Sequence, residues 1–329
     1  MSETPKIVLR KTRDFGQKIN ATIEFLRYNF KNFFTVLIYI AGPVAALYSA
    51  FMVLTVNNMT GIFQRMISNP DPEEFLSIEF LSSTGLTMLF SLLSYTFIYA
   101  TVLEYINVYL EKKGNGTIEV SEVWDRVKKS IVTIILAGIF LLFAFILLGV
   151  AVVVVVSLLA FIPVVNILGM IALGIVFLYI SITLSLFYVV LVIEKKPLNN
   201  LTDVIRRCFF LIKDKWWSTF GLLFVMSLMV GFAGGMLQMP ISFAQFFTSI
   251  DSLDSDDPMA MMSVYENPLL LAYLGVVQFI NVLLQSVTLL AVVFQYFNLV
   301  ELKEAKGLMS EIEEVTNTDT SDEEENETY

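Results

Sequence analysis

The stretch YVVLVIEKKPLNNLTDVIRRCFFLIKDKWWSTFGLLFVM, from Tyr188 to Met226, decides the fold of this chain. An apolar run ends near Glu194, a charged and aromatic segment follows, and a second apolar run starts at Trp216. Within the segment, Asp203, Arg206 and Arg207 lie opposite a set of apolar residues at helical spacing, namely Leu201, Val204, Ile205, Cys208 and Ile212. Two such stripes predict an amphipathic helix that lies on a membrane surface and joins two membrane-spanning helices.

The composition of the whole chain is that of an integral membrane protein. Of its 329 residues, 56% are hydrophobic and 16% are charged, and the mean hydropathy is +0.72. Soluble domains are roughly half apolar and a quarter charged. A bilayer core about 30 Å thick needs about 20 apolar residues per helix. Six runs are long enough, and they cover 33–56, 80–109, 131–160, 165–193, 216–237 and 268–299.

These apolar runs are continuous rather than alternating, which predicts helices and not a membrane barrel. We therefore predict an all-α membrane protein with six transmembrane helices. Residues 1–32 form a cytoplasmic N-terminus with an amphipathic helix, and residues 33–306 form the transmembrane domain. Residues 307–329 form an acidic tail that is too polar to fold alone and is expected to be disordered.

Positive charges predict the orientation in the membrane. Of the 21 Lys and Arg residues, all but Arg65 lie before the first run, after the sixth, or in the loops after the second and fourth runs. The positive-inside rule then puts both termini in the cytoplasm. No cleavable signal peptide is visible, so the first span is expected to direct insertion into the cytoplasmic (inner) membrane.

The amphipathic pattern occurs three times. It is present in residues 13–31 and again in TIEVSEVWDRVKKSIV, residues 117–132, where Glu122/Arg126 and Asp125/Lys129 have the spacing of i,i+4 ion pairs. The third copy is the segment described first. Each copy precedes two apolar runs, which predicts three hairpin units, each preceded by an amphipathic interfacial helix on the cytoplasmic side.

The ends of the second, fourth and sixth runs repeat as well. The segments VYLEKKG, LVIEKKP and LVELKEAKG carry Glu111, Glu194 and Glu301, followed by lysines. Before the fifth run, Trp216 and Trp217 form an aromatic pair of the kind that anchors helices at a membrane interface. The candidate interfacial motif therefore consists of Glu111, Glu194, Glu301, Arg206, Arg207, Trp216 and Trp217. The expected partners are lipids of the anionic inner leaflet and a membrane protein, and no nucleic acid.

The order of residues from the fourth run into the fifth resembles a family of bacterial multipass inner-membrane proteins. The resemblance rests on Val192, Glu194, Asp203, Ile205, Arg206, Arg207, Leu211, Lys213, Trp216 and Trp217. The family includes the membrane domain of some glycerophosphoryl diester phosphodiesterases. It implies a six-helix membrane module. It does not imply phosphodiesterase activity, because the chain holds no soluble barrel domain of about 250 residues.

Catalytic chemistry is not expected. The chain has no His, which excludes histidine-dependent triads and HExxH metalloprotease sites, and it lacks a GxxxxGK[ST] phosphate loop. Its single cysteine, Cys208, excludes an intramolecular disulfide. The acidic loop DSLDSDDPMAMM has Met262 in place of the terminal Glu of a calcium loop, which favours a solvated loop. We expect no catalytic, cofactor-binding or metal-binding residue.

Polar residues inside the apolar runs leave two functions open. Glu104 is a deeply placed ionisable side chain, and such residues are functional candidates by default. Gln278, Asn281 and Gln285 share one face of the sixth run. If these four residues line a path, they predict a transporter or channel for a small molecule or lipid. If they form interhelical hydrogen bonds of about 0.6 kcal/mol each, they predict a packed bundle. The favoured interpretation is a non-enzymatic scaffold that organises lipids or a membrane partner.

Overall fold

The computed structural model describes residues 7–68, 77–114, 116–158, 161, 163–195, 201–253, 264–265 and 267–305. In chain order its helices are α1 (Phe15–Ile40), α2 (Gly42–Ser68), α3 (Ile78–Glu111), α4 (Val120–Leu158), α5 (Pro163–Leu184), α6 (Phe187–Ile193), α7 (Leu201–Ile212), α8 (Trp216–Leu253) and α9 (Pro268–Glu304). No strand occurs in these ranges, which confirms the predicted all-α class. The acidic tail and most of the acidic loop 251–262 lie outside the described residues.

Six helical stretches within the described residues are long and apolar enough to cross a membrane. They are Gly42–Met66, Ile78–Glu111, Val120–Leu158, Val164–Ile193, Trp216–Ile250 and Pro268–Glu304. The number of these helices agrees with the six predicted spans, and all but the first overlap the predicted ranges closely. The protein is therefore described below as a polytopic membrane protein.

The first predicted span, 33–56, is divided between two helices. The helix α1 is capped by Asp14, whose side chain accepts a hydrogen bond from the Gln17 amide, and it runs without a break from Phe15 to Ile40. A second helix, α2, then begins at Gly42. The division follows from Pro43, which lacks a backbone N–H and disfavours a helical residue before it but is tolerated in the first turn of a new helix. The apolar span accordingly starts at Gly42 rather than at residue 33.

The three amphipathic segments differ in how they join the spans. Residues 15–31 form the first part of α1, and residues 120–131 form the first turns of the long helix α4. Only the third copy, α7, is a separate helix, bounded by a turn before Trp216. The fourth predicted span is also divided, because a turn at Ser185 and Leu186 separates α5 from α6.

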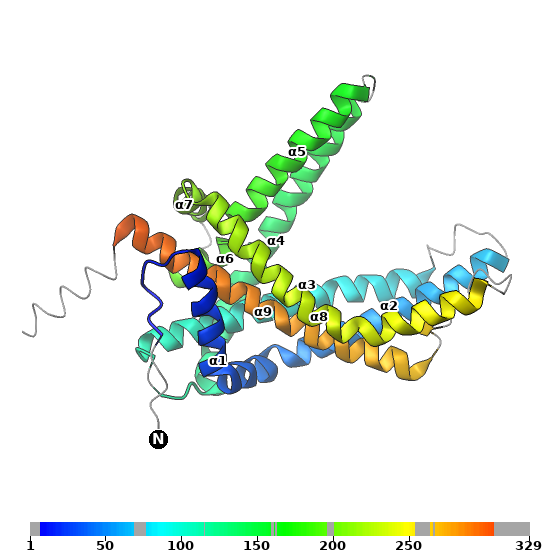
Figure 1. The fold of residues 1–329 in the computed structure, drawn as a ribbon, viewed down its shortest axis with the longest axis horizontal. Helices are drawn as coiled ribbons and strands as arrows, with labels where there is room; N and C mark the ends of the chain where they lie inside the picture. Colours follow the sequence, from blue (N-terminus) through cyan, green and yellow to red (C-terminus); the bar gives the residue numbers. More distant parts are fainter. Residues whose placement is uncertain are drawn as a thin grey trace, which may run out of the picture.

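The helix α9 lies at the centre of the molecule. It packs against α1, α2, α3, α6, α7 and α8, while the C-terminal part of α4 and the N-terminal part of α5 diverge from this group as a separate arm (Figure 1). Every residue from Leu289 to Glu301 is buried, so this part of α9 is covered on all sides. In α4, in contrast, only 6% of an apolar window of 18 residues is buried by the protein. In a bilayer such a helix surface faces lipid.

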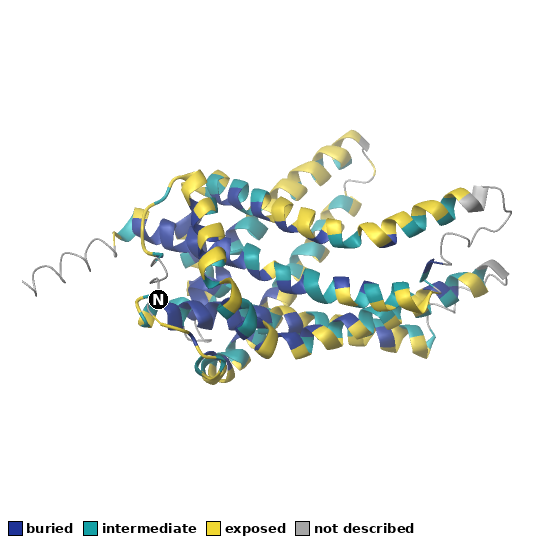
Figure 2. Ribbon diagram, turned by 60° about the horizontal axis from the view of Figure 1, so that its bottom comes forward, coloured by how far each residue is buried: buried dark blue, intermediate teal, exposed yellow. Residues whose placement is uncertain are grey.

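Buried residues gather at one end of the bundle, which we call the core end (Figure 2). We define it by Glu111 and Glu304, the last residues of α3 and α9, and by Glu194, the residue that follows α6. The rings of Phe25 and Tyr105 form an edge-to-face contact there, with centroids 6.4 Å apart. Phe25 also contacts the ring of Phe294 at 5.9 Å. Aromatic pairs of this geometry contribute about 0.5–1.5 kcal/mol beyond the area that they bury.

Each helix end that defines the core end is followed by the same backbone feature. Lys113, Lys195 and Ala305 have φ of 51°, 51° and 48°, and they are the described non-glycine residues with positive φ. A left-handed residue is a common way to end a helix, because it turns an amide toward the unpaired last carbonyls. The Ala305 amide, for example, donates to the Glu301 carbonyl oxygen. The segments that carry Glu111 and Glu194 therefore end their helices in a similar way, whereas α9 continues three residues beyond the predicted Glu301 before it ends at Glu304.

Candidate functional site

The helix α7 is joined to the core end by a partly buried ion-pair network. Arg207 Nε lies 2.9 Å from Glu194 Oε1, and Arg207 Nη1 lies 2.5 Å from Glu304 Oε1. The Tyr296 hydroxyl donates to the same Glu194 oxygen at 3.0 Å. The network therefore joins α7 to the ends of α6 and α9.

The sequence predicted that Arg207 would lie on the outward face of the helix, but only 18% of its side chain is exposed. Burial alone lowers the pKa of Arg207, but the hydrogen bonds to Glu304 and Glu194 outweigh this effect, so its pKa is raised. The guanidinium thus stays charged. A buried charge of this kind needs its partners, since burying an unpaired ion costs several kcal/mol.

One face of α7 packs against the rest of the protein. Val204, Cys208 and Ile212 of the predicted apolar stripe are inaccessible to solvent, as is Leu211, whereas Leu201 and Ile205 are partly buried. Burial, followed by the negative charge of Glu194, raises the pKa of the Cys208 thiol to about 12. Cys208 is therefore an apolar packing residue, as the sequence indicated.

Arg206 and the two tryptophans occupy the outer side of the same region. Arg206 is exposed and lies 3.6 Å from Asp203 on its own helix. The ring of Trp216 stacks on Tyr179 of α5, with centroids 5.7 Å apart, and its indole N–H donates to the Tyr179 carbonyl oxygen at 3.3 Å. Trp217 is 78% exposed. One tryptophan thus packs against protein, and the other projects from it.

A crevice of about 780 Å³ opens between α5 and the turn that leads into α8. Its wall includes two lysines, Lys213 and Lys215, together with Trp217 and the apolar side chains of Ile175 and Leu178. Asp214 also belongs to the wall, but its carboxylate is 2.9 Å from Lys303 Nζ. The crevice therefore combines positive charge with an apolar surface.

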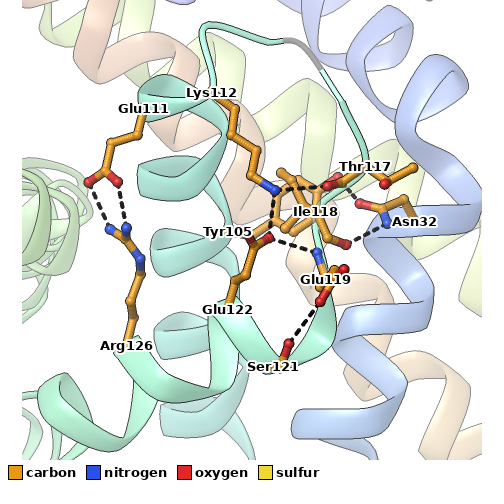
Figure 3. Close-up of polar contacts among 10 residues, drawn as sticks. All are labelled: Asn32, Tyr105, Glu111, Lys112, Thr117, Ile118, Glu119, Ser121, Glu122 and Arg126. Carbon is orange, nitrogen blue, oxygen red and sulfur yellow. Dashed lines mark hydrogen bonds and ion pairs between the residues drawn. The ribbon is translucent and has the colours of Figure 1, made fainter.

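A second group of charges lies where α3 turns into α4 (Figure 3). Arg126 binds both carboxylate oxygens of Glu111, with an Nη1–Oε1 distance of 2.8 Å, and Lys112 Nζ lies 2.7 Å from Glu122 Oε2. The expected i,i+4 pairs within α4 are thus replaced: Glu122 and Arg126 bind residues at the end of α3, and Asp125 pairs with Lys128 at 2.7 Å. The reason is the reversal of the chain between the two helices, which brings the charges of α3 within reach.

This corner also holds α1 in place. The Asn32 amide donates to the Ile118 carbonyl oxygen at 2.8 Å, and its carbonyl oxygen accepts from the Tyr105 hydroxyl at 2.8 Å (Figure 3). Two spanning units and the N-terminal helix are therefore hydrogen-bonded to one another at the core end.

Lys18 was not singled out by the sequence, although it is the most deeply buried charged residue among those described. Its side chain is 2% exposed, and its ammonium donates to Ser218 Oγ at 2.7 Å and Gln295 Oε1 at 2.8 Å. Burial, followed by the charge of Lys215, lowers the pKa of Lys18 to about 8. The sequence held one indication of this burial. Lys18 lies three residues after Phe15 and seven before Phe25, a spacing that places it on the face of α1 that packs against α8 and α9.

The remaining predicted site residues are dispersed. Glu301 is buried in the last turns of α9. Gln278 donates to the Tyr48 hydroxyl of α2 at 2.9 Å, Asn281 packs over Gly234 of α8, and Gln285 is exposed. These contacts are interhelical packing of the kind that small and polar residues provide in membranes.

Glu104 lies apart from the polar residues of α9. It is seven residues from the end of α3, or about 10 Å at 1.5 Å per residue, whereas Gln278 is 26 residues, or about 39 Å, from the end of α9. Both helices end at the core end, so the two residues lie at different depths. The structure brings Glu104 instead into the group of Glu111 and Arg126, along one pocket between α3, α4 and α6.

Comparisons with known proteins add no relative. No family model, no curated protein and no solved structure matches this chain.

Proposed function

We propose that this chain is a non-enzymatic, polytopic protein of the cytoplasmic membrane that organises anionic lipids of the inner leaflet at its core end. The observation that carries the proposal is the crevice beside α8. It places Lys213 and Lys215 next to Trp217 and the apolar side of α5. A phospholipid offers complementary groups, because its phosphate oxygens can bind the lysines and its acyl chains the apolar side chains.

The electrostatics of the crevice suit an anionic head group. Asp214 is paired with Lys303, so the two flanking lysines are left to attract negative charge from the bilayer. Each basic residue near an anionic surface contributes about 1 kcal/mol to binding. Trp217 is exposed at the position where aromatic rings anchor proteins at the interface.

The wider architecture of the proposal is three hairpin units, each with an amphipathic segment on the cytoplasmic side. Two observations support it. The helix ends at Glu111, Glu194 and Glu304 share a left-handed residue, and Glu111 and Glu194 each bind an arginine of the amphipathic segment that follows. The second ion pair lies within the segment that resembles the inner-membrane family, so we also propose that the resemblance reflects a shared module.

Lipid retention tests the proposal. The full chain, extracted in a mild detergent and analysed by native mass spectrometry, is expected to keep phosphatidylglycerol in preference to phosphatidylcholine. Changing Lys213→Gln and Lys215→Gln together removes about 2 kcal/mol of attraction, which corresponds to roughly 30-fold weaker binding. The matched control, Lys31→Gln with Lys128→Gln, removes two basic residues elsewhere and is expected to change binding less than about threefold.

Equal retention of both lipids, or equal loss in the two double variants, would contradict the lipid site. A protein that copurifies with the wild type and is lost with Lys213→Gln/Lys215→Gln would instead identify a membrane-protein partner as the occupant.

Topology is tested independently of lipid binding. A fluorescent protein that matures only in the cytoplasm is expected to be bright when fused after Lys306 and dark when inserted between Asp254 and Asp257. A dark C-terminal fusion would refute the proposed orientation of both termini.

Transport is the second candidate function, and buried Glu104 is the observation that favours it. Cysteine scanning of Gln278, Asn281 and Gln285 in a Cys208→Ser background separates the two candidates. Water-soluble thiol reagents are expected to leave Gln278→Cys and Asn281→Cys unlabelled if these positions are packing contacts, and labelling of both would indicate a water-filled path.

A further inference from the structure

The pocket between α3, α4 and α6 is distinct from the lipid crevice. Its volume is about 730 Å³, within the range of about 300–1,000 Å³ that is usual for small-molecule sites. Its wall includes eight charged residues, of which four are acidic and four basic: Glu104, Glu111, Glu122, Asp125, Lys112, Arg126, Lys129 and Lys195. A pocket of this composition is suited to a polar ligand rather than an acyl chain.

Most of these charges neutralise one another. Glu111 pairs with Arg126, Glu122 with Lys112, and Asp125 with Lys128 outside the wall. Among the described residues, Glu104, Lys129 and Lys195 take part in no ion pair. One negative and two positive groups are therefore left for a ligand.

Glu104 is the unusual member of this set. Its side chain is 7% exposed, and its hydrogen bond is a single one, from the Asn107 amide to Oε2 at 3.0 Å. A carboxylate withdrawn from water this far is stabilised by positive groups or further donors. Arg126 attracts Glu104 through space but binds Glu111 directly. Because Glu104 forms part of the pocket wall, a direct positive partner can come from a bound molecule.

The order of the charges selects the kind of molecule. Glu104 lies about 10 Å deeper than Glu111 along α3, whereas Lys195 follows the end of α6 and Lys129 is exposed. A ligand must therefore present an ammonium group inward and an anionic group toward water. A phospholipid of the adjacent leaflet has the opposite order, because its phosphate lies between its acyl chains and its amine. A polyamine would be repelled by the two lysines.

We propose that this pocket binds a small amino acid from the aqueous phase, with its ammonium group on Glu104 and its carboxylate between Lys129 and Lys195. The hydroxyl groups of Ser130 and Thr133 and the amide of Asn107 supply further polar contacts in the same wall. The site is additional to the lipid crevice, and the proposal does not depend on it.

Thermal stabilisation of the full chain in nanodiscs of neutral lipid tests the site. The probes are glycine, alanine, 4-aminobutanoate and 6-aminohexanoate, with butylamine and butanoate as matched molecules that carry one charge each. We expect at least one amino acid to raise the unfolding temperature in a saturable way, and neither single-charge molecule to do so at the same concentration.

Two variants separate binding from folding. Glu104→Gln keeps the shape and the acceptor for Asn107 but removes the charge, and it is expected to weaken binding at least about 30-fold. Lys129→Gln alters an exposed residue that cannot disturb the core, and it is expected to weaken binding about threefold to tenfold. The controls Glu24→Gln, an exposed carboxylate outside the wall, and Lys213→Gln/Lys215→Gln are expected to bind as the wild type does.

Stabilisation by none of the amino acids would overturn the proposal, and so would equal stabilisation by butylamine or butanoate. Unchanged affinity in Lys129→Gln would also overturn it. If phosphatidylethanolamine in the nanodisc stabilises the chain in a Glu104-dependent way and the amino acids do not, the ligand is a lipid head group and the proposed aqueous source is wrong.

Discussion

Replacing Arg207 by leucine tests whether protein or lipid holds α7 in place. In the wild type the guanidinium binds Glu194 and Glu304, whose side chains are 14% and 23% exposed. Arg207→Leu leaves both carboxylates in this largely buried position without the cation between them. Breaking one partner of a buried ion pair costs about 3–5 kcal/mol, and the partial exposure of these groups places the expected cost near about 3 kcal/mol.

Hydrogen exchange in nanodiscs measures this cost locally. A loss of about 3 kcal/mol corresponds to roughly a hundredfold faster exchange of the α7 amides, in anionic and neutral lipid alike. Arg206→Glu is the matched change at the neighbouring, exposed position, and there we expect less than about tenfold faster exchange, confined to anionic lipid. Arg126→Leu breaks the analogous pair with Glu111 and is expected to leave α7 unaffected.

The opposite pattern would refute this reasoning. If Arg207→Leu exchanges like the wild type while Arg206→Glu opens α7 in anionic lipid, then attraction to the bilayer holds the helix and the ion pairs do not.

Three further outcomes are expected. Burial lowers the pKa of Lys18 from 10.5 to about 8, so the unfolded chain binds this proton more tightly than the folded chain does. Stability to unfolding should therefore rise as pH increases from about 8 to about 10.5. Denaturation curves of a Lys18→Met variant should lack that rise. The Cys208 thiol, buried and with a pKa raised to about 12, should resist maleimide at pH 8 in the folded chain and react fully in sodium dodecyl sulfate. A Cβ at Gly234 would overlap the side-chain oxygen of Asn281, so Gly234→Ala should lower the unfolding temperature and Asn281→Ala should restore much of the loss.

The spans could be predicted from the sequence because membrane insertion depends on local composition. Continuous apolar length alone identified six helices, and the 3.6-residue period of α7 identified its buried residues Val204 and Cys208. The break at Ala41 was also encoded locally, by the proline two residues later. The local pattern could not show whether the span begins before or after Pro43, because residues 33–40 are themselves apolar enough to be part of a span.

The charged contacts could not be predicted in the same way. Helical spacing predicted an ion pair between Glu122 and Arg126 and an outward position for Arg207. In the structure Glu122 pairs with Lys112, Arg126 with Glu111 and Arg207 with Glu194, so each partner lies outside the helix. An ion pair is decided by which ends meet in space, and the sequence gives no distance between helices. The repeated helix-ending glutamates were the one hint, because their recurrence beside basic amphipathic segments indicated a common role.

Because α9 lies at the centre of the molecule, several contacts of the N-terminal helix can form only after α9 has been synthesised. The Lys18 ammonium bonds Gln295, a residue 277 positions later in the chain. Synthesis at about 5–20 residues per second separates these two residues by roughly 15–55 s. During that interval α1 has been synthesised, but the acceptor for its buried ammonium and the aromatic partner of Phe25 on α9 have not. A chain whose translation stops before α9 therefore lacks the contacts that bury this part of α1.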